Sequence, residues 1–181
     1  MNKFVTFIAL LFLAGCAGLN PNIGERSTDV AWTSGDKVRA FEIAKPKAEA
    51  GEPWAQLRLG IFYENGWGDS RDDNIAEYWY KKVIAQKSKG DWAEGKLVGA
   101  TGKQGYFNQN SDARIAEHNL AQIYLINNRN LLEAHRLIKN VIKETEGKDV
   151  FFCCEFAGGR YFSQKQFIEL EEKIAKKLSE K

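Results

Sequence analysis

The chain has 181 residues, a length typical of one domain, and carries 26 Lys and Arg against 24 Asp and Glu. This near-neutral balance argues against a nucleic-acid-binding protein, which normally carries a basic patch or stripe. Eleven Phe, six Tyr and five Trp are enough for a hydrophobic core, and only three Pro leave room for long helices.

The N-terminus has the composition of a targeting segment. A short positive start, Met1–Lys3, precedes an almost continuous apolar run from Phe4 to Ala14. This run is too short for a bilayer core, which needs about 20 helical residues, so it predicts a signal peptide. The next residues, Leu13-Ala14-Gly15-Cys16, resemble the bacterial lipobox, where cleavage precedes a Cys that carries acyl chains.

The lipobox resemblance implies a signal peptide over residues 1–15 and lipidation at Cys16. Ala17 is not the Asp that retains such proteins in the inner membrane, so the resemblance implies the periplasmic face of an outer membrane. An ordinary secretory signal with an incidental Cys is the alternative. Residues 16–35 show scattered turn formers and predict a tether. Within the tether, Trp32 is expected to dock on the first helix or to face a partner.

The repeat domain is predicted over residues 36–181. Residues Asp36 to Gly51 reproduce the spacing of a second repeat helix, which predicts a truncated first unit. Pro46 is expected to kink or end this helix, because its ring lacks the N–H and clashes with the preceding turn.

Apolar periodicity predicts helices over 53–65 and 72–86, joined as an antiparallel hairpin. Gly66 is expected to take the left-handed conformation that ends a helix, and Gly68 to reverse the chain. The small residues Ala55, Gly60 and Ala76 stand where the helices must approach, beside bulky aromatic side chains.

Nine residues at fixed spacing resemble a SEL-one-like repeat, a short-hairpin relative of the tetratricopeptide repeat: Ala55, Leu59, Gly60, Tyr63, Gly66, Gly68, Asp72, Ala76 and Trp79. The resemblance implies an all-α fold, a right-handed α/α superhelix of short helical hairpins. It also implies a binding scaffold. The sequence departs from the family pattern at Asp69, at Val83 and Ile84, and at Lys87.

Five glycines interrupt residues 87–111, where Asp91 could cap a short helix through Lys96 to Ala100. A phosphate-binding loop is excluded there, because Leu97 and Gln104 occupy positions that the motif reserves for Gly and for Ser or Thr.

A second unit begins near Asp112, and its second helix is predicted over Leu131–Glu144 after an Asn-rich turn. A C-terminal capping helix is expected from Ser163 to the end. One apolar stripe should cover the last hairpin there: Phe167, Leu170, Ile174 and Leu178.

No catalytic constellation, metal-ligand spacing or cofactor motif is visible, so a non-enzyme is predicted, without cofactor or metal. His118 and His135 have no Cys or carboxylate at ligand spacing. Cys153 and Cys154 are expected to pack as small apolar groups among phenylalanines, and a strained vicinal disulfide is the alternative.

An apolar stripe on the helix over 53–65 faces away from the predicted hairpin core and is expected to bind a protein partner. Coverage of these residues by neighbouring hairpins is the alternative. The candidate partner-binding residues are Trp54, Leu57, Ile61 and Glu64, with His118, Gln122 and Leu125 at matching positions in the second unit and Trp67 at the hairpin tip.

Small lipid-anchored SEL-one-like proteins resemble immunity proteins that protect bacteria from type VI secretion lipase effectors in the periplasm. This resemblance implies a dedicated toxin partner, such as a phospholipase, and membrane attachment through acyl chains. The alternative is an envelope scaffold, similar to tetratricopeptide lipoproteins that organise peptidoglycan or outer-membrane assembly enzymes.

Overall fold

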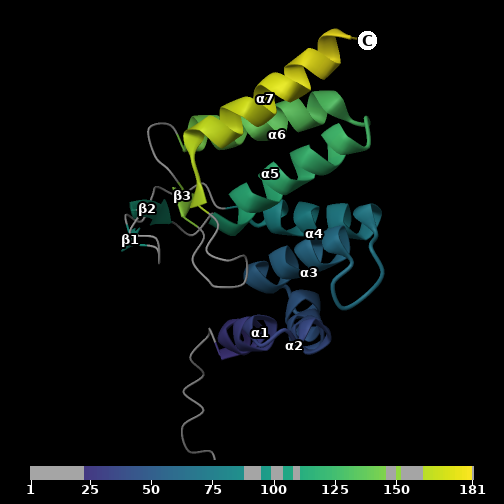
Figure 1. Ribbon diagram of the computed structural model, residues 1–181, viewed down its shortest axis with the longest axis vertical. Coiled ribbons are helices and arrows are strands. Elements are labelled where there is room, and N and C mark those ends of the chain that lie inside the picture. The colour runs from purple at the N-terminus through teal and green to yellow at the C-terminus, as the bar shows by residue number, and fades with distance from the viewer. Residues whose placement is uncertain are drawn as a thin grey trace, which may run out of the picture.

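The computed structural model describes residues 23–87, 95–98, 104–107, 111–145, 150–151 and 161–180. These residues form seven helices: α1 (Ile23–Thr33), α2 (Lys37–Glu49), α3 (Pro53–Asn65), α4 (Asp73–Ala85), α5 (Ser111–Ile126), α6 (Leu131–Glu144) and α7 (Gln164–Ser179). Each helix packs against the next one in the chain, and Figure 1 shows the resulting stack from α1 and α2 to α7. The predicted helical-hairpin class is confirmed, with α1/α2, α3/α4 and α5/α6 as the hairpins.

The first unit is a complete hairpin, which corrects two predictions. Residues 23–33 form α1 and not an extended tether, and α1 packs along α2, so the unit is not truncated. Helix α1 buries two small residues, Thr28 and Ala31. Two such residues do not make a recognisable apolar period in the sequence. Pro46 does not end α2, which continues to Glu49. Pro46 and the residue four positions before it are both exposed, so water can bond the carbonyl that loses its donor.

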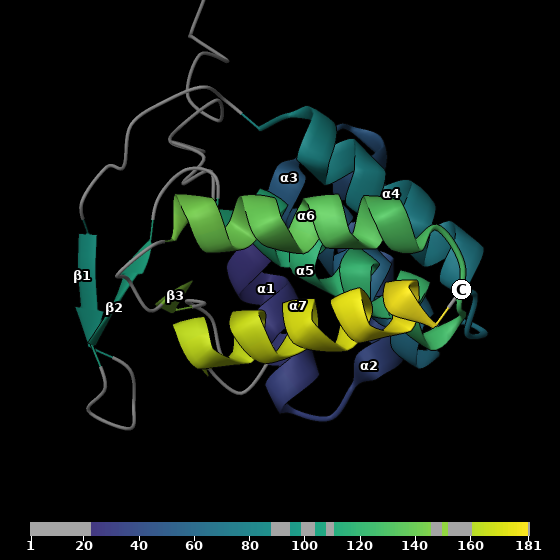
Figure 2. The same cartoon turned by 90° about the horizontal axis from the view of Figure 1, so that it is seen from above.

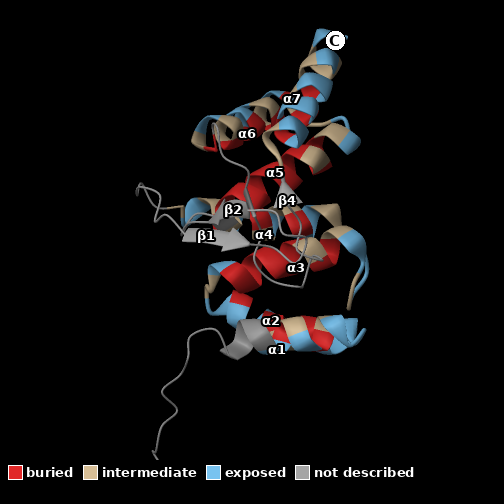
Figure 3. Ribbon diagram, turned by 60° about the vertical axis from the view of Figure 1, so that its left-hand side comes forward, coloured by how far each residue is buried: buried red, intermediate tan, exposed pale blue. Residues whose placement is uncertain are grey.

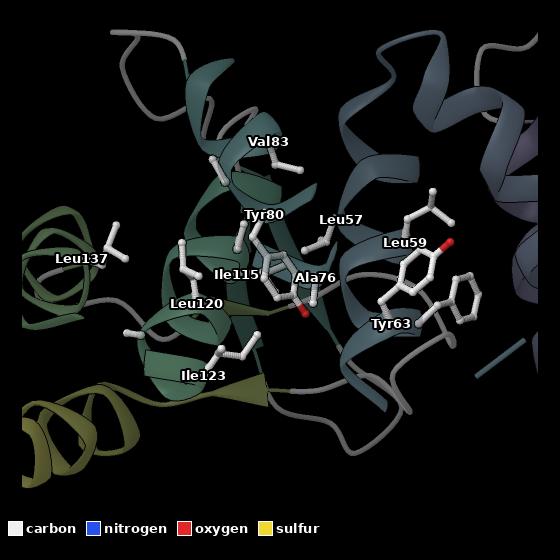
Figure 4. Packing of buried hydrophobic residues seen from close by; sticks show 14 of the residues in the cluster. Leu57, Leu59, Tyr63, Ala76, Tyr80, Val83, Ile115, Leu120, Ile123 and Leu137 are labelled. Carbon is white, nitrogen blue, oxygen red and sulfur yellow. The ribbon is translucent and has the colours of Figure 1, made fainter. Parts of the chain in front are cut away.

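Helix α3 lies between two layers and is buried on both sides. Figure 4 shows Leu57 on the side that faces Tyr80, with Leu59 and Tyr63 on the opposite side, toward the N-terminal helices. Figure 3 shows the same burial along α5, where every residue from Ala113 to Ala121 is buried. These two helices form the centre of the core.

The predicted turn chemistry is confirmed at the second hairpin. Gly66 ends α3 in the left-handed conformation (φ 67°), and Gly68 has φ 87°. A Cβ on Gly68 would lie 2.5 Å from Cβ of Phe41, so the hairpin tip packs directly on α2. Asp72 caps α4 by accepting hydrogen bonds from the backbone N–H groups of Asn74 and Ile75. At the third hairpin, Asn128 and Asn130 take the left-handed conformation that the shorter turn requires (φ 49° each).

A small sheet forms between two connections of the stack, the one from α4 to α5 and the one from α6 to α7. Its strands are β1 (Gly95–Val98), β2 (Gln104–Phe107), β3 (Val150–Phe151) and β4 (Tyr161–Phe162), in the order β1-β2-β3-β4. Strands β1 and β2 are antiparallel, β2 and β3 are parallel, and β3 and β4 are antiparallel. The short helix predicted through Lys96 to Ala100 is therefore wrong, because residues 95–98 pair as a strand.

The C-terminal helix begins as predicted. Ser163 and Gln166 form a reciprocal capping box at the start of α7. The stripe expected to cover the last hairpin is buried at Phe167, Leu170 and Ile174 and half-buried at Leu178. Seen from above in Figure 2, α7 runs beside α6.

Several predictions fall outside the described residues: the signal peptide, Cys16, the glycine-rich residues 99–103, Cys153 and Cys154. Among the helices that are described, none combines the length and the apolar content needed to span a membrane.

Candidate protein-binding surface

The first helices of successive units contact one another, α3 with α5 and α5 with α7. The predicted partner-binding residues of α3 and α5 therefore lie along one line of neighbouring helices. The structure separates them into a buried group and a half-buried group.

Trp54, Leu57 and His118 belong to the buried group, with 9%, 4% and 5% of their surface exposed. The indole N–H of Trp54 donates to the Glu52 carboxylate over 2.6 Å, and the guanidinium of Arg58 lies 5.1 Å from the Trp54 ring centre. These side chains belong to the core, so the prediction that they contact a partner is corrected. In the structure these three residues are buried by neighbouring parts of the chain, as the alternative interpretation of the sequence expected.

Neighbouring helices cover Leu57 and His118. Leu57 faces α4 and α5, as Figure 4 shows. The His118 ring packs edge-on against Phe167 of α7 with centroids 5.7 Å apart, and its Nδ1 lies 3.0 Å from Oδ1 of Asn119. Helix α7 thus covers part of the α5 face that the sequence analysis assigned to a protein partner.

Four predicted residues remain half-buried and are called the α3/α5 strip: Ile61, Glu64, Gln122 and Leu125. Ile61 and Leu125 pack against the core with part of their apolar surface still in contact with solvent. Glu64 is held in place, because the Tyr80 hydroxyl donates to its carboxylate over 2.5 Å. The Asn119 amide donates to the same hydroxyl over 3.1 Å, so one network joins α3, α4 and α5.

Trp67, the candidate at the hairpin tip, lies in a second half-buried cluster. Its ring centre is 4.5 Å from that of Trp32 in α1, and the two are called the tryptophan pair. The Lys37 ammonium lies 4.9 Å from the Trp67 ring and 5.2 Å from the Trp32 ring, within cation–π distance of both. Trp32 also packs on Phe62 of α3, with ring centres 5.9 Å apart, and it lies beside the predicted Trp67 site.

A four-charge cluster lies under the junction of the second and third hairpins, where sequence reasoning placed no functional residue. The Lys87 ammonium lies 3.0 Å from the Glu117 carboxylate and 2.7 Å from that of Glu144, which Arg114 approaches to 3.0 Å. Burial raises the pKa of Glu117 and lowers that of Arg114. The cluster links the end of α4 to α5 and to the end of α6.

The tips of the second and third hairpins are linked through Asp73. Its carboxylate accepts hydrogen bonds from Arg71 over 3.1 Å and from the Asn127 amide over 2.8 Å. The hydrogen bond from Arg71 is the main reason why the Asp73 pKa lies below its usual value, and burial opposes it.

We expect Asp73→Asn to lower the Tm by about 2 °C at pH 7. Because the folded pKa is depressed, the stabilisation is present above the unfolded pKa near 4 and disappears as the pH falls through the folded value. Thermal unfolding of both proteins at pH 7 and pH 3 measures this. A Tm difference that grows on acidification would contradict the assignment.

The described residues contain no group of three or more His, Cys, Asp and Glu side chains placed to hold a metal ion. What the described surface offers is apolar and aromatic contact area beside fixed polar groups, an arrangement suited to recognising a protein.

The comparisons with known proteins are sparse. No family model and no solved structure matches the chain. One segment of 54 residues is 43% identical to the chitin synthase regulator SKT5 of Saccharomyces cerevisiae. That segment is 30% of this chain and spans only 8% of the yeast protein, so this chain is similar to a small part of that regulator.

Proposed function

We propose that this protein binds and neutralises a partner protein at the periplasmic face of the outer membrane, as an immunity protein against a phospholipase effector of type VI secretion. The proposal rests on the resemblance of the hairpin sequence to SEL-one-like repeats and of residues 13–16 to a lipobox. The helical-hairpin architecture supports it, because stacked hairpins present extended binding surfaces.

The observation that carries the proposal is the α3/α5 strip. Ile61 and Leu125 are half-buried on the two helices that form the centre of the core, so their positions are fixed before any partner arrives. Preorganised side chains lose little conformational entropy on binding. The tryptophan pair adds the residue type that is most enriched among binding hot spots.

Membrane attachment through Cys16 would keep this surface close to the bilayer. Only residues 17–22 separate Cys16 from α1, and six residues reach at most about 20 Å. A toxin that attacks the bilayer would therefore be met next to its substrate. Processing that is sensitive to globomycin in the wild-type protein and absent in Cys16→Ser would support the anchor.

The gene neighbourhood gives the first test, since an immunity protein is expected beside a phospholipase-type effector gene. The effector of that neighbouring gene, purified with this protein, should form a stable complex in size-exclusion chromatography and lose its lipase activity. An effector that elutes alone and stays fully active would contradict the immunity proposal.

Ile61→Asp combined with Leu125→Asp should weaken this complex at least about 30-fold, because each change places a charge in an apolar contact. Val38→Asp is the matched control, since Val38 is 56% exposed on α2 and lies outside the α3/α5 strip. Isothermal titration of the three proteins against the effector measures the effect. Equal affinity of the double variant and the control would remove the strip from the binding surface.

The second candidate function is an envelope scaffold that organises cell-wall enzymes. The 54-residue similarity to a chitin synthase regulator favours it, because that protein is named as the regulator of an enzyme. Cross-linking of the full chain in cells separates the two candidates: a peptidoglycan enzyme as the cross-linked partner supports the scaffold, and the effector supports immunity.

A further inference from the structure

The outward surfaces of α4 and α6 carry a set of exposed residues that the proposed function does not use. It is called the α4/α6 face and consists of Ile75, Tyr78, Lys81, Lys82, Arg136, Lys139 and Lys143. On α6 the basic residues recur every three or four positions, which places them on one side of the helix. Every charged residue of the two helices that is exposed and not half-buried is basic.

The acidic residues of these helices are half-buried and occupied. Asp73 pairs with Arg71, Glu77 with Lys81 and Arg129, Glu133 with Arg136, and Glu144 with Lys87 and Arg114. Lys82, Lys139 and Lys143 form no ion pair with any residue that the structure describes. All three lysines are exposed, so their ammonium groups can meet an external anion.

The basic side chains of α4 and α6 lie on the same surface of the molecule. The pKa of Glu133 in α6 is lowered mainly by its hydrogen bond with Arg136, and also by Lys81 of α4. Ion pairs also connect the two helices at both ends: the Arg129 guanidinium, just before α6, lies 3.1 Å from the Glu77 carboxylate of α4, and the Lys87 ammonium, just after α4, lies 2.7 Å from the Glu144 carboxylate of α6.

Aromatic and aliphatic side chains lie among these charges. Tyr78 is 51% exposed, its ring centre is 5.0 Å from that of Trp79, and the Lys82 ammonium lies 5.4 Å from the Tyr78 ring. Ile75, one helical turn before Tyr78, is 38% exposed. Tyr and Trp favour the membrane interface, because one end of each side chain is apolar and the other is polar.

We propose that the α4/α6 face lies on an anionic lipid surface, with its lysines near the headgroup phosphates and Tyr78 and Ile75 at the level of the upper acyl chains. Each Lys or Arg near such a surface contributes about 1 kcal/mol to binding. A nucleic acid would use the lysines and leave Ile75 without an apolar partner, so a bilayer matches the face better. The proposal stands independently of the identity of any protein partner.

The test uses the full chain with Cys16→Ser, which removes acylation. Co-sedimentation is measured with vesicles of phosphatidylcholine alone and with vesicles containing about 30% phosphatidylglycerol. The N-terminal run, with its basic Lys3, is the same in every variant, so the difference between variants on the anionic vesicles isolates the charged face. Lys139→Glu combined with Lys143→Glu should reduce binding to the anionic vesicles about tenfold or more.

The matched control is Lys173→Glu combined with Lys176→Glu, which makes the same charge change at exposed positions of α7. It should reduce binding much less. Tyr78→Ser should weaken binding severalfold, and raising the salt concentration should weaken binding of the unmutated face. Equal binding to both vesicle types, an equal loss in the α7 control, or tighter binding to a DNA duplex than to the anionic vesicles would overturn the proposal.

Discussion

Replacing Gly60 with alanine is expected to lower the free energy of unfolding by about 2–3 kcal/mol. A Cβ at this position would lie 2.4 Å from Cε1 and 2.6 Å from Cδ1 of Tyr80. Tyr80 has no exposed surface, and its hydroxyl is held by Glu64 and Asn119, so the ring has no free space to move into. The gain in helix propensity, about 1 kcal/mol, offsets only part of the clash.

Chemical denaturation of the wild-type protein, the two single variants and the double variant with Tyr80→Leu tests this packing. The smaller side chain removes the ring atoms that the new methyl group would meet, so the double variant should lose less stability than the sum of the single losses. Additive losses would show that Gly60 is not required for the close approach of α3 and α4.

Lys87→Met is expected to cost about 3 kcal/mol, or roughly 10 °C in Tm, because it leaves the carboxylate of Glu117 buried without its closest cation. Only 3% of the Glu117 side chain is exposed, so water does not replace the lost contact. Lys82→Met is the matched control on α4, since Lys82 is exposed and forms no ion pair with a described residue.

The loss caused by Lys87→Met should shrink on acidification. Burial raises the pKa of Glu117 and Lys87 opposes this, so removing Lys87 raises the folded pKa further above the unfolded value near 4.3. A raised folded pKa means that the native state takes up a proton more readily than the unfolded chain, which stabilises it as the pH falls. Thermal melts of the variant and wild type at pH 7 and pH 5 measure this change. A difference that is constant or larger at pH 5 would refute the role of Glu117.

The hairpins could be predicted because their signals are local. Gly60 indicates a close approach of two helices, and in the structure it lies against the Tyr80 ring. Gly66 and Gly68 indicate positions of left-handed backbone, and both have positive φ in the structure. The bounds of α3 and α6 follow directly from apolar spacing. Helix α1 was missed because most of its burial rests on small or polar residues such as Thr28, which resemble a linker.

The candidate surface was only partly predictable, because periodicity shows which residues share a face and not what covers that face. Leu57 and His118 occupy matching positions in two repeats, yet α4 and α5 cover the first and Phe167 of α7 covers the second. The four-charge cluster left no sequence signal, since Lys87 and Glu117 are separated by thirty positions and meet only through the stacking of hairpins.

Survival of producing cells tests the proposed partner binding most directly. Cells that secrete the neighbouring phospholipase-type effector into their periplasm should survive when they also make this protein. They should die when they make the variant with Ile61→Asp and Leu125→Asp, at equal protein level. Equal killing with and without the wild-type protein would contradict the account.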